Sequence, residues 1–123
     1  MLAYVTLGTN DTDKALAFYD AFMPALGAKR LFDNDRLYFY GTGQGAPMLA
    51  IGGPYDGEPA TCGNGVMPAL ACPDRETVDK AYQAALDAGA QDDGAPGERV
   101  PGMFYGGYFR DPDGHKICVC KLG

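Results

Sequence analysis

Apolar and polar residues alternate along the chain in a pattern that predicts two helices among many short strands. The first apolar run, residues 2–7, is β-branched and aromatic and ends at Gly8, which is typical of a strand. Asn10 and Asp11 then offer capping oxygens for a helix that runs to Gly27, because apolar residues recur along it at helical spacing. Three strands are expected next, at about Arg30–Phe32, Arg36–Tyr40 and Pro47–Ile51.

The second half of the chain repeats this order after a segment rich in glycine and proline. Residues 66–72 predict a strand, and Asp74 is placed to cap a second helix that ends at Gly89. Further strands are expected at about Ala90–Asp92, Met103–Arg110 and His115–Leu122, the last two joined by the turn Asp111-Pro112-Asp113-Gly114. The two closing glycines lie about 62 residues apart, which favours an internal duplication over a chance likeness of two α/β segments.

These elements predict an α+β fold in one domain. The 123 residues suit a single domain and are too few for two independent ones. Residues 1–123 are therefore expected to form two βαβββ modules, at about residues 1–53 and 64–123, around a cavity of ligand size.

Composition narrows the classes of partner. The chain carries 16 acidic and 10 basic residues, for a net charge of −6, and its basic residues are scattered, so a nucleic-acid partner is not expected. No apolar stretch is long enough to span a membrane, and the N-terminus predicts a strand and no signal peptide, so we expect a cytoplasmic protein. The cysteines lack zinc-site spacing and are expected to be free thiols: Cys62, Cys72, Cys118 and Cys120.

Three segments carry a family pattern. They are Tyr4-Val5-Thr6-Leu7 followed by Asn10-Asp11 and Ala17-Phe18-Tyr19; residues 64–71 followed by Pro73-Asp74-Arg75; and residues 108–117, which read Tyr-Phe-Arg-Asp-Pro-Asp-Gly-His-Lys-Ile. Together they resemble the vicinal-oxygen-chelate superfamily, which holds glyoxalases, bleomycin-resistance proteins and extradiol dioxygenases. The resemblance implies paired modules whose sheets curl into a half-open barrel around the ligand, with the helices outside.

The resemblance also implies where a divalent metal would be held. Metal-binding members place a His at the position of Tyr4, a His or Gln near Met67 and a Glu at the position of Cys118, and this chain has replaced all three. Tyrosine and methionine are poor ligands for such ions, and one thiolate does not complete a site. We therefore expect no metal and no other cofactor.

A ligand-binding wall is expected on the C-terminal hairpin. Phe104, Gly106 and Tyr108 alternate along one face of the strand that pairs with Cys118, and the resemblance turns that face inward. Aromatic strand faces also occur as plain core, so both interpretations stay open. The full set predicted to contact a ligand joins these to an opposite wall: Tyr4, Tyr38, Tyr40, Met48, Met67, Phe104, Tyr108 and Cys118.

The remaining reactive residues favour structural roles. His115 is the only histidine and follows the turn glycine, where it is expected to point away from the cavity. With no other imidazole in the chain, a Ser-His-Asp triad and a His-based metal site are not expected. Cys118 is a nucleophile only if a base or cation lowers its pKa, and Lys116 is the nearest cation in the sequence. Asp111 and Asp113 fit turn chemistry.

Two further features have a structural and a functional interpretation. Arg110 and Lys116 face each other across the hairpin, either as a solvated pair or as an anchor for an anion. The segment Gly94–Gly102 is either a long connection or a lid over the cavity.

Three functions fit these observations. The first is a metal-free member of the family that binds a small organic molecule. The second is a metal-dependent lyase or dioxygenase with ligands at unexpected positions such as Glu58, Glu98 or Cys118. The third is a structural or interaction protein whose cavity has filled. A homodimer is expected by analogy with the family.

Overall fold

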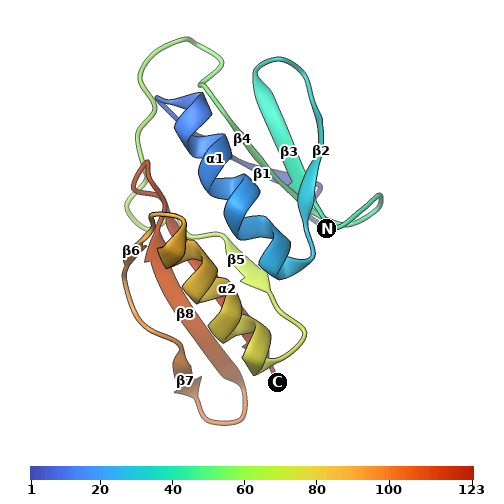
Figure 1. Cartoon of the computed structure of the whole chain (residues 1–123), viewed down its shortest axis with the longest axis vertical. Helices are drawn as coiled ribbons and strands as arrows, with labels where there is room; N and C mark the ends of the chain where they lie inside the picture. The colour runs from blue at the N-terminus through green and yellow to red at the C-terminus, as the bar shows by residue number, and fades with distance from the viewer.

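The computed structural model describes residues 1–123 and has two helices and two separate mixed sheets. One sheet occupies the upper half of the molecule in Figure 1 and the other the lower half, with the two helices between the viewer and much of the strands. The predicted α+β fold with two βαβββ modules is confirmed. The strands do not close into a barrel.

Sheet A contains the four strands of the first half. Its order is β1-β4-β3-β2, with β1 parallel to β4 and the other neighbours antiparallel. The strands are β1 Tyr4–Gly8, β2 Lys29–Asp33, β3 Leu37–Gly41 and β4 Met48–Gly52.

Sheet B repeats this order in the second half, with one strand broken in two. The strands are β5 Ala69–Ala71, β6 Gln91–Asp92, β7 Gly97–Val100, β8 Phe104–Arg110 and β9 Lys116–Leu122, and the path β5-β9-β8-β6 is joined by β7, which also pairs with β8. The predicted connection Gly94–Gly102 thus contains a strand. The break between its two parts falls at Gly94, whose φ of +140° suits only glycine, and at Pro96, which has no N–H for a ladder.

The helices begin at the predicted caps and end differently. α1 spans Thr12–Phe22 and α2 spans Arg75–Asp87; the side chains of Asp11 and Asp74 accept hydrogen bonds from backbone N–H groups three residues on. The first helix does not continue to Gly27 as an α-helix, because Pro24 has no N–H to donate within it. The chain tightens instead into the 3₁₀ turn η1, Met23–Leu26.

One hydrophobic core joins both halves. It lies between the helices and the sheet faces that they cover, and its buried side chains come from α1, η1, α2 and strands of both sheets. Phe22 of α1 packs edge-on against Phe109 of β8 with ring centroids 5.2 Å apart. The two modules therefore stabilise each other, since each contributes its helix to the shared core.

Each sheet has a covered face, toward the helices, and an open face, turned away from them. Pairing register assigns the residues: Val5, Leu7, Tyr38, Tyr40, Leu49 and Ile51 belong to the covered face of sheet A, and Tyr4, Thr6, Leu37, Phe39, Met48 and Ala50 to its open face. In sheet B, Tyr105, Phe109, Ile117 and Val119 are covered, whereas Phe104, Tyr108, Arg110, Lys116, Cys118 and Cys120 lie on the open face. β1 and β5 each keep one unpaired edge. Neither helix meets the length and apolarity needed to span a membrane.

Candidate functional site

An aromatic cluster lies on the open face of sheet A. Tyr4 meets Phe39 edge-on with centroids 5.1 Å apart, and Phe32 stacks on the other side of Phe39 at 4.6 Å. Tyr4 is 47% exposed and Phe32 is 52% exposed. Two large aromatic rings thus remain at the surface beside a buried third, an arrangement that can receive a flat ligand.

A pocket of about 530 Å³ opens beside this cluster. Tyr4 and Thr6 form its wall on the sheet, and the loop of residues 53–61 forms the other wall. Arg36 enters the same pocket, where its Nη1 donates to the carbonyl oxygen of Gly53 at 2.8 Å and its guanidinium lies over the ring of Tyr55 at 5.4 Å. Sequence reasoning did not single out Arg36, because a charged residue in a turn has no periodic signal.

The open face of sheet B brings together three of the predicted residues. Tyr108 pairs directly with Cys118, and Gly106 pairs with Cys120. Phe104 folds back over Gly106, where a Cβ atom would lie only 2.7 Å from the Phe104 ring, so glycine is needed at that position. Phe104, Tyr108 and Cys118 therefore share one face, as the alternation of the strand predicts.

The cysteines of this region are poor nucleophiles. Burial raises the pKa of the Cys118 thiol to about 12, and the nearby Cys120 adds to the shift. Burial likewise raises the pKa of Cys72 to about 11. Both thiols are protonated at neutral pH, so the structure favours a space-filling role for Cys118 over nucleophilic catalysis.

Tyr38 and Tyr40 were expected to share the ligand cavity with Tyr108, and the structure places them elsewhere. The register of β3 sets both on the covered face, opposite Ile51 and Leu49. The hydroxyl of Tyr40 donates to Asp20 of α1 at 2.8 Å, and its pKa is raised by burial first and by Asp20 second. The prediction missed this because two tyrosines separated by one residue share a face, but the sequence does not say which face the helix covers.

The donor set does not suit a metal ion. Met67 lies in the coil before β5, Tyr4 lies on sheet A and the Cys118 thiol is held protonated by burial. No three His, Cys, Asp or Glu side chains anywhere in the chain are arranged to hold a metal ion. The residues at the family's ligand positions thus do not fit the metal that the fold implies.

The C-terminal turn connects the modules through a buried polar network. The Asp111 carboxylate accepts from the Tyr19 hydroxyl at 2.6 Å and from the backbone N–H of His115 at 2.9 Å. Nε2 of His115 lies 2.7 Å from the carbonyl oxygen of Gly8, and Asp113 accepts from the backbone N–H of Asn10. These contacts assign the turn residues to structure, and the covered position of His115 leaves no ligand-facing imidazole.

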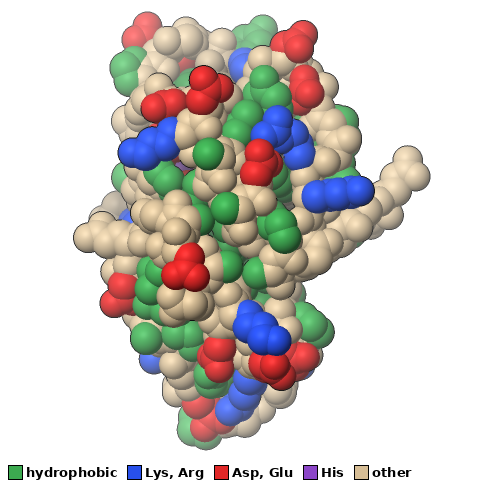
Figure 2. Space-filling model, in the orientation of Figure 1, with side chains coloured by type: hydrophobic (Ala, Val, Ile, Leu, Met, Phe, Trp, Pro, Cys, Tyr) green, Lys and Arg blue, Asp and Glu red, His purple; other side chains and the backbone are tan.

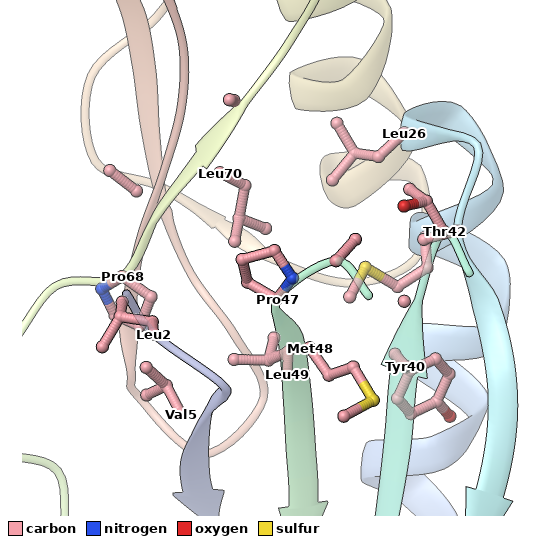
Figure 3. Close-up of a pocket in the computed structure, with 16 residues that line it drawn as sticks. Leu2, Val5, Leu26, Tyr40, Thr42, Pro47, Met48, Leu49, Pro68 and Leu70 are labelled. Atoms are coloured by element: carbon pink, nitrogen blue, oxygen red, sulfur yellow. The ribbon is translucent and has the colours of Figure 1, made fainter. Parts of the chain in front are cut away.

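A second cavity, the inter-module pocket, lies between sheet A, η1 and β5. Its volume is about 420 Å³, and no charged residue lines it. Figure 3 shows Leu26, Leu70 and Pro47 pointing toward one another across it, with Tyr40 and Met48 below. Of the predicted ligand-binding residues, only Tyr40 and Met48 belong to this pocket. Sequence patterning could not reveal it, because it lies where two modules meet without pairing their strands.

Charges on the face shown in Figure 2 are interspersed, with acidic side chains beside most basic ones and no continuous basic patch. Ion pairs of the protein include Arg30 with Asp20 and Lys80 with Glu76.

The repeated modules, the shared core and the open sheet faces define an α+β protein of the two-module, half-open type. A family model described as Glyoxalase/Bleomycin resistance protein/Dioxygenase superfamily matches residues 1–119. The chain belongs to this superfamily, which confirms the resemblance inferred from its three motifs.

Solved structures agree. A glyoxalase/bleomycin resistance protein from Albidiferax ferrireducens is 35% identical, with a TM-score of 0.90 over 100% of this chain and 99% of that one. A glyoxalase-related enzyme from Fulvimarina pelagi is 23% identical, with a TM-score of 0.76 over 98% of this chain and 87% of that one, and shows likeness of fold alone. A search of curated proteins finds no match.

Proposed function

We propose that this protein binds a small organic molecule on the open faces of its sheets without using a metal ion. The observation that carries the proposal is the pair of aromatic surfaces left uncovered on both sheets. Tyr4 and Phe32 are about half exposed on sheet A, and Phe104 and Tyr108 lie on the open face of sheet B. Folded domains usually bury aromatic rings, because burial of each ring removes a large apolar area from water.

The proposed site keeps six of the residues predicted from sequence. Tyr4 and Met48 belong to the open face of sheet A, and Phe104, Tyr108 and Cys118 to that of sheet B. Met67, in the coil that leads to β5, is 39% exposed and is included as a flexible apolar contact. Tyr38 and Tyr40 are left out of it because they lie on the covered face.

A homodimer is part of this proposal. β1 and β5 each offer an unpaired edge, and exposed apolar side chains accompany the open faces, among them Leu122 and Val100. A second copy that pairs along these edges would bring open faces together and shield the ligand from water. We expect a particle of twice the 13.0 kDa chain mass by light scattering, and a strictly monomeric protein would remove this part of the proposal.

The inter-module pocket is a second candidate location for the ligand. Its volume lies within the usual range for small-molecule sites, and its lining without charges favours an uncharged apolar molecule. A metal-dependent lyase or dioxygenase is not proposed, since the donor chemistry described above does not support one.

Fluorescence titration with the uncharged dye N-phenyl-1-naphthylamine tests the proposal and separates the two locations. The dye is expected to bind in buffer containing EDTA, to bind at least about fivefold more weakly to Tyr4→Ala, and to bind unchanged to Leu70→Trp, which fills the inter-module pocket. Loss of binding in Leu70→Trp alone would move the site to that pocket. Binding that appears only after a divalent metal is added would contradict the proposal.

A further inference from the structure

Two of the five arginines of this acidic protein form no salt bridge. Arg30, Arg75 and Arg110 each form a salt bridge with a carboxylate, whereas Arg36 and Arg99 form none. The Nη2 of Arg99 donates instead to the backbone carbonyl oxygen of Ala95. Since the chain has 16 acidic residues for 10 basic ones, an arginine without an acidic partner is not explained by a shortage of carboxylates.

Arg99 belongs to a group of cations on the open face of sheet B. Its guanidinium lies 5.4 Å from the centroid of the Tyr108 ring, and the Lys116 ammonium lies 5.3 Å from the same centroid. The negative face of an aromatic ring attracts cations, so both charges are held at the ring of Tyr108. Gly94 permits this arrangement, because a Cβ at its position would lie 3.0 Å from the Tyr108 ring and 3.6 Å from Arg99.

Positive charge exceeds negative charge at this place. Arg110 and Lys116 share one carboxylate, that of Asp93, at 3.0 and 3.6 Å. The other nearby acidic side chains face the helices: Glu98 bonds to Arg75 at the start of α2, and Asp92 accepts from the Tyr82 hydroxyl. Three cations therefore have a single carboxylate between them, on the face that carries Phe104 and Cys118.

We propose that the ligand of this protein is an organic anion whose negative group is bound by Arg99 and Lys116 while its apolar part contacts the aromatic side chains of the open faces. This inference rests on the proposed function and names the chemical class of its ligand. A guanidinium that has no acidic partner and an ammonium at the same ring suit a carboxylate or a sulfonate, and an excess of positive charge attracts the anion from solution. Tyr108 is a positioning residue, because it holds the two cations in place.

Two dyes with the same ring system separate the contribution of the anionic group to binding from that of the apolar rings. 8-Anilino-1-naphthalenesulfonate carries the anion, and N-phenyl-1-naphthylamine lacks it. Both are titrated at low ionic strength into the wild type, Arg99→Gln, Lys116→Gln and the control Lys14→Gln, which removes a positive charge from α1. The exposed side chain of Arg99 makes a loss of folding in Arg99→Gln unexpected, and circular dichroism checks it.

The expected result is a selective effect. Arg99→Gln and Lys116→Gln should each weaken binding of the sulfonate dye by about fivefold or more and leave the affinity for the neutral dye within about twofold of the wild type. The control Lys14→Gln should leave the affinity for both dyes within about twofold. Unchanged sulfonate binding in both variants, with the neutral dye still bound, would overturn the anion inference and leave the proposed function standing. Equal weakening of both dyes would also overturn it. If neither dye binds the wild type, the proposed function falls and this inference with it.

Discussion

The two faces of each sheet differ in how far their side chains are buried and in how their polar groups are paired. On the covered faces, large side chains such as Phe109 and Ile117 are fully buried, and the polar groups among them are paired, as Tyr19 is with Asp111. On the open faces, the rings of Tyr4 and Phe32 are about half exposed, and Arg36 and Arg99 have no acidic partner. The same strands supply both sides, since alternate residues point in opposite directions.

This difference indicates that alternate residues of the same strand serve different purposes, stability on the covered face and binding on the open face. Substitutions on the covered face should act on the free energy of unfolding, and those on the open face on binding and association. The following predictions test that separation, from the largest expected effect to the smallest.

Matched phenylalanines on the two faces should differ most. Phe109→Ala should destabilise the fold by about 3–5 kcal/mol, because it leaves a cavity in the shared core. Phe32→Ala, at a ring 52% exposed, should cost about 1 kcal/mol or less. Urea unfolding followed by circular dichroism measures both, and Phe109→Leu serves if the alanine variant does not fold. Equal losses would mean that the faces are not distinct.

Breaking the polar network between the modules should have the next largest effect. Tyr19→Phe leaves one oxygen of the buried Asp111 carboxylate without its 2.6 Å donor and should cost about 1–3 kcal/mol. The control is Tyr105→Phe, which removes a hydroxyl bonded to Asp79 at the surface and should cost about 1 kcal/mol or less. Thermal unfolding of the two variants gives the comparison, and a smaller loss for Tyr19→Phe would contradict the account of the turn.

Alkaline pH should act on the same network. Burial, and then the charge of Asp111, raise the pKa of Tyr19 well above its ordinary value of 10.0. The unfolded chain therefore releases this proton at lower pH than the folded chain, so its contribution is intact below pH 10 and is lost as the pH rises toward the raised pKa. In that window the wild type should lose about 1.4 kcal/mol per pH unit more than Tyr19→Phe. Parallel pH profiles in urea unfolding would contradict the assignment.

Thiol labelling should distinguish the exposed cysteine from the buried ones without changing stability. Cys62 is exposed, whereas Cys72, Cys118 and Cys120 are buried, and burial raises the pKa values of Cys118 and Cys72. Iodoacetamide at pH 7 should therefore label one cysteine in the folded protein and four after unfolding, by mass spectrometry. Rapid labelling of Cys118 in the folded protein would reopen its role as a nucleophile.

Local chemistry made much of the fold predictable. The caps Asp11 and Asp74 and the Asp-Pro-Asp-Gly turn act through backbone contacts a few residues away, so their positions follow from sequence. The end of α1 at Phe22 and the strand β7 at Gly97–Val100 could not be predicted in this way. The first depends on a competition between two kinds of helix, and the second depends on pairing with β8.

The candidate site was harder to predict for a physical reason. Alternation placed Phe104, Tyr108 and Cys118 on one face, and also Tyr38 and Tyr40 on one face, but only packing decides which side the helix covers. Phe39 and Arg99 become part of the candidate site through neighbours in space, Tyr4 for Phe39 and Tyr108 for Arg99. Spacing along one strand does not contain that information.

Chemical-shift mapping by NMR tests the central claim most directly. N-phenyl-1-naphthylamine is added to ¹⁵N-labelled protein in EDTA, and backbone amide shifts are followed residue by residue. The account predicts that the largest shifts lie on the open faces, around Tyr4, Phe39 and Tyr108. Shifts centred on Leu26 and Leu70, or shifts that require an added metal ion, would contradict it.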